Sequence, residues 1–270
     1  MLQLSRFTRF SLIGVVIFIL IFMYTPLLIV VLNSFNQAQI SSWPIDTYSL
    51  KWWEFAATYQ PIRTALLNSV IVATGAMVIA LLLGTMVAFA LKGFDFFGRG
   101  TINLLVVLPI ALPGVVTGVA FSNTYNTFLS PLGINLGYFG MIVAHATFCI
   151  VMVFNNVFAR LKRMNPSLQE ASADLGAGLW QTFRLVTFPQ FRTSFMAGAL
   201  LAFALSFDEV VVTIFTAPPG VDTLPLWILK EMARPNQGSV VNVVATTVIL
   251  LSLIPVYASQ RLTRAQENGG

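Results

Sequence analysis

Six long stretches of the sequence carry almost no charge, and they constrain the fold more than any other feature. A helix needs about 20 apolar residues to cross the roughly 30 Å of hydrocarbon in a bilayer, and each stretch is long enough. Their apolar residues recur with a helical period, and the runs exceed the roughly 10 residues of an outer-membrane strand. We place them at residues 10–32, 65–91, 102–121, 138–159, 195–216 and 240–259. The sequence therefore predicts an all-α membrane protein with about six transmembrane helices, in a single transmembrane domain over residues 1–270.

The composition and the distribution of charge agree with this prediction. The chain is 57% hydrophobic and 9% charged, whereas a soluble domain has roughly 25% charged residues. Of the 15 Lys and Arg residues, 11 lie on one side of the predicted spans: Arg6, Arg9, Lys92, Arg99, Arg160, Lys162, Arg163, Arg184, Arg192, Arg261 and Arg264. Basic residues accumulate in cytoplasmic loops, so both termini are expected in the cytoplasm. This bias explains the net charge of +5 without a role in nucleic-acid binding.

The residues that carry chemistry in enzymes are scarce in this chain. The single cysteine, Cys149, excludes an internal disulfide, and the single histidine, His145, has no second ligand at metal spacing. We interpret His145 as structural. No Ser-His-Asp arrangement and no Gly-x-x-x-x-Gly-Lys-Ser/Thr phosphate loop is present, so the sequence favours neither a membrane-embedded enzyme nor an ATPase.

A polar segment at residues 160–192 separates the fourth and fifth stretches. Ser167 and Glu170 have the spacing of a capping box, which predicts a short helix that begins near Ser167. Gly176 can end this helix in a left-handed turn. A second helical segment at residues 179–188 then leads to Pro189, which we expect to break the approach to the fifth span.

Such a helix-turn-helix presents Leu168, Ala171, Leu175 and Leu179 to a groove on a partner. A short helix held at both ends can pass a rigid-body push to the spans behind it. An ordinary helix at the membrane interface is the alternative, but it does not account for the spacing from Gly176 to Pro189.

The segment resembles the cytoplasmic EAA loop of bacterial ABC importer permeases. The pattern of that loop is matched at Glu170, Ala171, Gly176, Val186 and Pro189. It is not matched at two positions, where Ser172 replaces the usual second alanine and Phe188 the usual leucine. In that family the loop docks on the ATPase subunit. The resemblance therefore implies that the following residues couple to an ATPase: Ser167, Leu168, Glu170, Ala171, Asp174, Leu175, Gly176 and Pro189.

Other segments resemble the second permease of spermidine/putrescine importers, and the similarity extends from about residue 10 to residue 264. The segments are residues 108–118, 206–213, 223–227 and 240–246. The resemblance implies a type I ABC importer permease in a bacterial cytoplasmic (inner) membrane. It also implies a homologous second permease, two ATP-binding subunits and an external solute-binding protein as partners. ATP and Mg²⁺ would belong to the partner ATPase, and this chain would bind no cofactor.

The substrate is not fixed by this resemblance, because similar permeases are assigned to amino-acid-like and phosphonate compounds. The sequence itself points to a cation. Asp208 and Glu209 are the only acidic residues in the predicted spans, and carboxylates inside a membrane are costly unless they are paired or hydrated. On a continuous helix Glu209 shares a face with Ser206, Thr213 and Thr216, which predicts a polar stripe along a water-filled pathway. The alternative is that both carboxylates are structural.

Several polar or small residues in the other spans have two possible roles. Pro109, Pro113, Gly114 and Gly118 predict either a bent helix that lines the pathway or a packing kink. A second set has amide or hydroxyl side chains, which either line the pathway or form contacts between helices: Asn155, Asn156, Asn242 and Thr246. A third set has the spacing of a close-packing seam: Ala80, Gly84 and Ala88.

The outer loop at residues 33–64 contains Trp43, Trp52 and Trp53, which favours a short helix at the membrane interface. It forms either an aromatic belt or part of a landing surface for a binding protein.

The remaining alternative for the whole chain is a secondary transporter or channel that works without ATP. That class needs a coupling-ion site or an inverted repeat, and the sequence shows neither.

Overall fold

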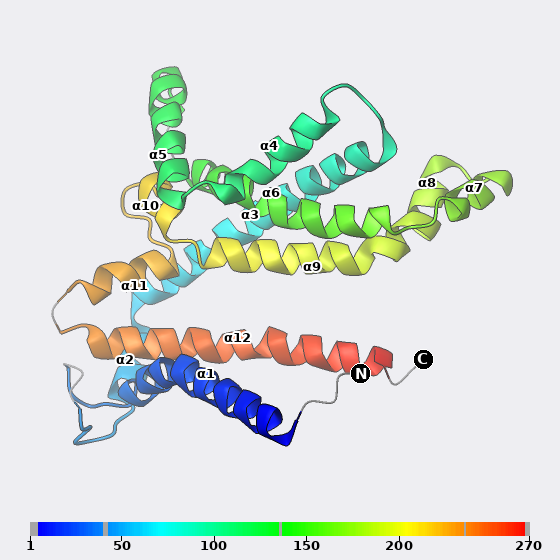
Figure 1. Ribbon diagram of the computed structural model, residues 1–270. Helices are drawn as coiled ribbons and strands as arrows, with labels where there is room; N and C mark the ends of the chain where they lie inside the picture. The colour runs from blue at the N-terminus through cyan, green and yellow to red at the C-terminus, as the bar shows by residue number, and fades with distance from the viewer. Residues whose placement is uncertain (1–4, 40–42, 135–136, 235, 268–270) are drawn as a thin grey trace. The chain divides into compact units, whose positions relative to one another are not determined.

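The computed structural model describes residues 5–39, 43–134, 137–234 and 236–267, and these residues form mainly helices (Figure 1). The side chains of Arg6, Arg261 and Arg264 lie outside the described residues. Among the described residues, extended backbone pairs only in one isolated bridge, between Asn36 and Tyr48. The chain divides into two compact units, residues 1–63 with 227–270, and residues 64–226. The all-α fold class is confirmed.

Three helices in the described part of the chain are long and apolar enough to cross a membrane. They are α1 (Arg6–Asn33), α3 (Gln60–Gly93) and α6 (Tyr138–Lys162). They coincide with the first, second and fourth predicted stretches; α1 and α3 are longer at both ends, and α6 is longer only at its C-terminal end. Hydropathy alone locates such helices because the chain must satisfy its backbone hydrogen bonds internally within lipid.

The third predicted stretch is a bent pair of helices. α4 (Arg99–Ala111) and α5 (Gly114–Thr124) meet at an angle of 106°, and α5 runs on through a π turn, Tyr125–Leu129, and a 3₁₀ turn, Ser130–Leu132. Pro113 explains the bend. It lacks an N–H, and it forces the residue before it out of helical geometry, so Leu112 has an extended ψ of 140°. The predicted bend is confirmed.

The fifth predicted stretch, residues 195–216, is not one continuous helix, so this prediction is wrong. α9 (Phe188–Phe207) has Asp208 as its C-cap, and the short α10 (Val211–Thr216) begins after Glu209 and Val210. The break lies where the polar side chains of Asp208 and Glu209 interrupt the apolar run.

The sixth predicted stretch lies in α12 (Gly238–Glu267), whose apolar described part, Gly238–Ser252, is shorter than a membrane span. The described residues thus contain three helices that can cross a membrane, or four if the bent pair α4–α5 counts as one crossing. Six crossings in a single domain remains a prediction.

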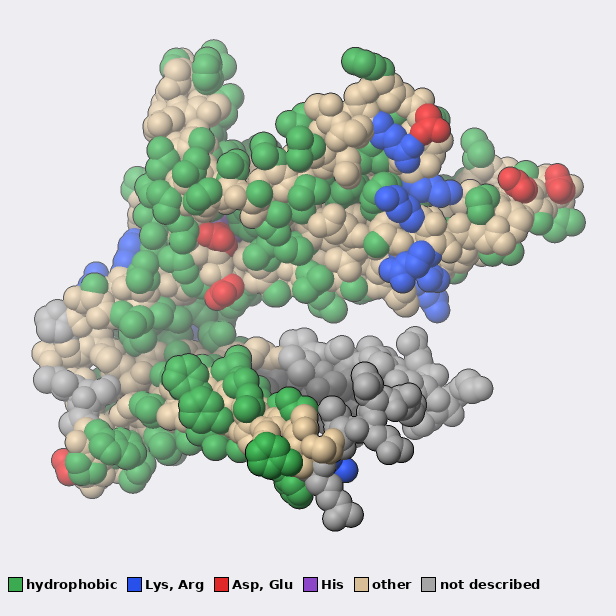
Figure 2. Space-filling model, in the orientation of Figure 1, with side chains coloured by type: hydrophobic (Ala, Val, Ile, Leu, Met, Phe, Trp, Pro, Cys, Tyr) green, Lys and Arg blue, Asp and Glu red, His purple; other side chains and the backbone are tan. Residues whose placement is uncertain are grey.

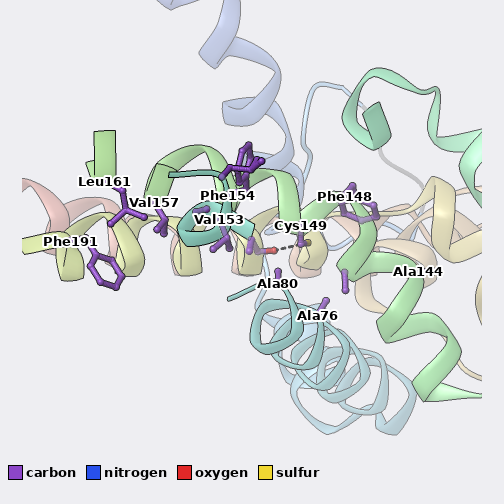
Figure 3. Close-up of a cluster of buried hydrophobic side chains, with 14 of the residues drawn as sticks. Ala76, Ala80, Ala144, Phe148, Cys149, Val153, Phe154, Val157, Leu161 and Phe191 are labelled. Carbon is purple, nitrogen blue, oxygen red and sulfur yellow. Dashed lines mark hydrogen bonds between the residues drawn. The ribbon is translucent and has the colours of Figure 1, made fainter. Parts of the chain in front are cut away.

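The core of the unit formed by residues 64–226 lies between α3, α6 and α9. Figure 3 shows Ala76 and Ala80 of α3, Phe154 and Leu161 of α6, and Phe191 of α9 in one buried cluster. The Cys149 thiol donates a hydrogen bond to the Ala202 carbonyl over 3.3 Å. Lipid tails are as apolar as these side chains, so close packing rather than the hydrophobic effect holds the helices together.

Small residues allow this close packing. A Cβ at Gly84 would lie 3.0 Å from the Ile150 carbonyl oxygen and 3.1 Å from the Phe154 nitrogen. A Cβ at Gly198 of α9 would lie 3.1 Å from the Val153 Cα. Ala80 and Ala88 are fully buried on either side of Gly84. The predicted seam at Ala80, Gly84 and Ala88 is confirmed.

The unit formed by residues 1–63 and 227–270 contains α1, α2 (Lys51–Thr58) and α12, and residues 227–232 of α11 (Leu224–Met232) also belong to it. α12 contacts both α1 and α2. The Ser239 hydroxyl donates to the Ala38 carbonyl over 2.6 Å, and the Trp52 indole donates to the Gln37 carbonyl over 3.3 Å. α2 is the short helix that the aromatic residues of this loop predicted.

Candidate functional site

The 160–192 loop is helical along most of its length. α7 (Ser167–Asp174) is followed by a turn at Gly176, by α8 (Leu179–Thr182) and by a π-helical turn, Phe183–Thr187, that leads directly into α9. Both predicted helical segments are therefore present. The loop belongs to the unit formed by residues 64–226, and Figure 1 shows α7 and α8 at the end of α6 and α9.

The start of α7 differs from the prediction. The helix begins at Ser167 as expected, but Pro166 is its N-cap and no side chain caps it, so the capping box of Ser167 and Glu170 is not formed. The Asn165 side-chain oxygen instead accepts the backbone N–H of Ser167 over 3.1 Å. Because Ser167 is already the first helical residue, its hydroxyl lies one position too late to act as the cap.

The end of α7 is as predicted. Gly176 has a φ of +78°, the left-handed conformation that a residue with a Cβ resists. The Gly176 N–H donates to the Ala173 carbonyl over 2.8 Å, and the Ala177 N–H donates to the Ser172 carbonyl over 3.1 Å. These two bonds satisfy carbonyls that the last helical turn would otherwise leave unpaired.

Side chains join α7 to the segment that returns to α9. The hydroxyls of Ser172 and Thr182 lie 3.0 Å apart, and the Gln169 amide donates to the Thr187 hydroxyl over 3.3 Å. The two arms of the loop therefore form one connected body. Such a body can transmit a displacement rather than absorb it.

Several apolar side chains of this loop are exposed. Leu175 is 88% exposed and Leu179 is 95% exposed, while Leu168 and Ala171 are also exposed. Trp180, which the sequence interpretation did not include, is 70% exposed beside them. Exposed apolar side chains that lie together on a polar loop indicate a surface that a partner covers.

Charged side chains around the loop are arranged by sign. Glu170 and Asp174 are exposed, and Figure 2 shows acidic side chains at the tip of the α7–α8 segment and basic side chains near its base. The basic residues at the ends of α3, α4, α6 and α9, and in the loop itself, are Lys92, Arg99, Arg160, Lys162, Arg163, Arg184 and Arg192. Their position agrees with a cytoplasmic membrane surface.

The base of the loop is fixed to the helices behind it. The Arg160 guanidinium donates to the Gln190 carbonyl over 2.7 Å, which joins α6 to α9. The rings of Phe183, Phe188 and Phe191 pack against one another at centroid distances of 5.4–6.4 Å. The prediction that Pro189 breaks this approach is wrong, because Pro189 lies in the first turn of α9, where its missing N–H has no required partner.

The two membrane carboxylates lie at the break between α9 and α10. Asp208 is exposed and Glu209 is half-buried. One carboxylate oxygen of Glu209 accepts the Val212 N–H over 2.9 Å, and the Thr213 hydroxyl donates to the Glu209 carbonyl over 2.7 Å. Glu209 thus caps the start of α10 with its side chain.

The predicted helical stripe of Ser206, Glu209 and Thr213 does not exist as a stripe, because the helix is interrupted between Ser206 and Thr213. The tertiary structure nevertheless brings Ser206 and Thr213 together at the buried ring of His145. The His145 Nδ1 lies 2.9 Å from the Ser206 hydroxyl, and its Nε2 lies 3.0 Å from the Thr213 hydroxyl. The sequence offered one signal for this contact, since a lone histidine in an apolar span requires two polar partners.

The bent third stretch packs on the same break. A Cβ at Gly114 would lie 3.3 Å from the Val211 side chain, and one at Gly118 would lie 2.7 Å from the Phe215 ring. These glycines therefore allow α5 to lie against α10. The proposed lining of a pathway by this bent helix stays a prediction.

Of the other predicted pathway residues, Asn155 and Asn156 lie on α6, whereas Asn242 and Thr246 lie on α12 of the other unit. Asn155 is exposed on α6, about 15 Å along the helix from His145. The Asn156 amide donates to the Met152 carbonyl of its own helix over 2.8 Å. Asn242 is half-buried on α12, and Thr246 is buried. Among the residues that the structure describes, no three His, Cys, Asp or Glu side chains are grouped to hold a metal ion.

Residues 80–266 match the family described as "Binding-protein-dependent transport system inner membrane component". The chain is 30% identical over 249 residues to the spermidine/putrescine transport system permease protein PotC of Escherichia coli K12, with 92% of each chain covered. It is 28% identical over 251 residues to the putrescine transport system permease protein PotI of the same organism, with 91% of this chain and 88% of the relative covered.

The fold is similar to a chain in the crystal structure of a bacterial ABC transporter involved in the import of the acidic polysaccharide alginate. The TM-score is 0.70 at 16% sequence identity, and the similarity covers 98% of this chain and 99% of that chain. At this identity the comparison supports the fold alone.

Proposed function

Because the chain belongs to the binding-protein-dependent transport system inner membrane components and is a permease subunit of an ABC importer, we propose that this importer carries polyamines or a related small cation. The observation that carries the proposal is the pair of adjacent carboxylates, Asp208 and Glu209, at a helix break. Relatives named for spermidine and putrescine transport add independent support.

The chemistry of the break suits a cation with ammonium groups. Glu209 uses one carboxylate oxygen to cap α10, so its remaining lone pairs are available to a ligand. Asp208 is exposed beside it. A charged carboxylate at membrane depth is stabilised by an opposite charge or by water, and a polyamine with two or more ammonium groups supplies such charges. We assign Ser206 and Thr213 to the support of this site, since their hydroxyls bond to His145.

The coupling loop (residues 160–192) transmits the action of an ATPase in this proposal. Its exposed leucines, Leu168, Leu175 and Leu179, fill a groove on the ATP-binding subunit. The hydrogen bonds within the loop and the phenylalanine cluster at its base carry the movement of that subunit into α6 and α9. ATP and Mg²⁺ are held by the partner, since the sequence of this chain has no phosphate loop.

The complete importer contains further chains in this proposal. A homologous second permease completes the pathway, two ATP-binding subunits supply the energy, and an external solute-binding protein delivers the solute. The chain crosses the inner membrane several times with both termini in the cytoplasm. The family assignment excludes the ATP-independent transporter or channel that the sequence left open.

The test is the ATPase activity of the complete complex, reconstituted with its binding protein, across polyamines, amino acids and phosphonates. We expect stimulation by spermidine or putrescine and a loss of uptake in the Glu209→Gln variant. Stimulation by only a neutral or anionic solute would keep the importer and reject the cationic substrate.

A further inference from the structure

His145 occupies a special position at the break between α9 and α10. Its ring is fully buried, and it lies on α6, the helix that packs against both α9 and α10. One ring nitrogen bonds the Ser206 hydroxyl, one residue before α9 ends, and the other bonds the Thr213 hydroxyl in the first turn of α10. One side chain of a third helix therefore holds both sides of the break.

The number of hydrogens available determines which group donates and which accepts in each of these bonds. The Thr213 hydroxyl has one hydrogen, and it donates this hydrogen to the Glu209 carbonyl. The Thr213 oxygen must then accept its bond from His145 Nε2–H. A neutral imidazole has one donor and one acceptor, so Nδ1 accepts from the Ser206 hydroxyl. The result is a continuous chain of donors from Ser206 through His145 and Thr213 to the backbone of Glu209.

Both the backbone carbonyl and the side-chain carboxylate of Glu209 are hydrogen-bonded to α10. Its carbonyl accepts from the Thr213 hydroxyl, and its carboxylate accepts from the Val212 N–H. The place of the carboxylate therefore follows the place of α10. The bond from His145 Nε2 to Thr213 ties α10 to α6 at this end of the short helix.

We infer that His145 is a positioning residue, which fixes the geometry of the break between α9 and α10 and thereby the place of the Glu209 carboxylate. The functional part of the inference rests on the proposed function, in which Glu209 meets the transported cation. His145 itself is buried and does not contact the solute. It acts through Thr213.

The chain offers a matched control close to His145. Cys149 lies one turn further along α6, and its thiol donates to the Ala202 carbonyl of α9. The Cys149→Ala variant thus removes a side-chain hydrogen bond between the same two helices without reaching α10. It also removes the only cysteine of the chain, which allows spin labels to be placed elsewhere.

The first experiment measures the geometry of the break in the assembled complex in nanodiscs. Spin labels are attached at Leu201→Cys on α9 and Ile214→Cys on α10, both exposed positions, in the Cys149→Ala background. Double electron–electron resonance gives the distribution of the distance between the labels. We expect His145→Leu, Ser206→Ala and Thr213→Val to broaden or shift this distribution. An unchanged distribution in all three variants overturns the inference.

The second experiment measures uptake of radiolabelled spermidine by proteoliposomes. We expect His145→Leu to lower uptake about tenfold while the complex still assembles. His145→Gln recovers part of the loss, because its amide can donate to Thr213. Cys149→Ala transports normally. If His145→Leu does not assemble, Ser206→Ala and Thr213→Val carry the same test.

A double-mutant cycle separates positioning from general packing. If His145 acts through Glu209, then His145→Leu causes no further loss of uptake in a Glu209→Gln background. Losses that multiply would overturn the inference. Normal uptake by Glu209→Gln together with a broadened distance distribution would reject the proposed function but keep the geometric role of His145. If Glu209→Gln impairs uptake but the distance distribution is unchanged in the His145, Ser206 and Thr213 variants, the proposed function is kept and the positioning role of His145 is rejected.

Discussion

At the scale of single residues, one substitution at Glu209 can remove the negative charge of its side chain without moving that side chain. In the Glu209→Gln variant, the amide oxygen can still accept the Val212 N–H, so the cap of α10 remains while the charge is lost. We expect uptake of a cationic solute to fall about tenfold, which corresponds to about 1.4 kcal/mol of lost interaction with the cation. The measurement is uptake by proteoliposomes with the complex quantified separately. Asp95→Asn is the control, because Asp95 lies in an exposed loop and pairs with Arg99.

A second prediction at this scale concerns Gly176. Its left-handed backbone disfavours a side chain, so Gly176→Ala should destabilise the end of α7 by about 1–2 kcal/mol. We expect weaker substrate stimulation of the ATPase in the reconstituted complex. Gly178→Ala, two residues further, is the matched control because Gly178 has an ordinary φ of −69°. Equal effects of the two variants would show that the turn conformation is not what matters.

At the scale of the element, the coupling loop presents leucines that no part of its own unit covers. We expect Leu175→Asp and Leu179→Asp together to lower the affinity for the ATP-binding subunit at least tenfold, since burial of one leucine contributes about 1.5–3 kcal/mol. Co-purification of the subunits at graded concentrations measures this effect. Leu132→Asp, at an exposed leucine between α5 and α6, is the control and should leave the association intact.

The seam between α3 and α6 carries another prediction for helix packing. A valine at Gly84 would press on the backbone of Ile150 and Phe154, which cannot move as a flexible side chain can. We expect Gly84→Val to destabilise the protein by about 1–3 kcal/mol and to lower the thermal midpoint of the detergent-solubilised complex. Gly14→Val should have little effect, because no atom lies within 4 Å of the position of its Cβ. Similar thermal midpoints for the two variants would contradict the claim that Gly84 allows α3 to pack closely against α6.

At the scale of the whole molecule, the basic residues predict an orientation. A cysteine at Leu175 should react with a membrane-impermeant maleimide only in inside-out vesicles, and a cysteine at Tyr48 only in right-side-out vesicles. Both positions are exposed, and the native Cys149 is buried. Labelling of both positions from one side would refute the predicted topology.

The sequence predicted the helical class, the spans α1, α3 and α6, the bend near Pro113 and the two helical arms of the coupling loop. Each of these depends on local properties: the length of an apolar run, the missing N–H of Pro113, and the left-handed freedom of Gly176. The capping-box pattern predicts the N-cap of α7 one residue too late, since Ser167 is already helical. The sequence predicts a helix break at Pro189, which is wrong, because the position of Pro189 in the first turn of α9 is not visible in the sequence.

The contact of His145 with Ser206 and Thr213, across the break between α9 and α10, was decided by tertiary structure alone. Periodicity treats residues 195–216 as one helix, and on such a helix Glu209 shares a face with Ser206 and Thr213. The actual partner of both hydroxyls is His145, which lies 61 and 68 residues away along the chain. A pattern of local hydropathy cannot predict a contact between residues so far apart in the sequence. It forms only because the close packing of α6 with α9 and α10 places the imidazole beside the break.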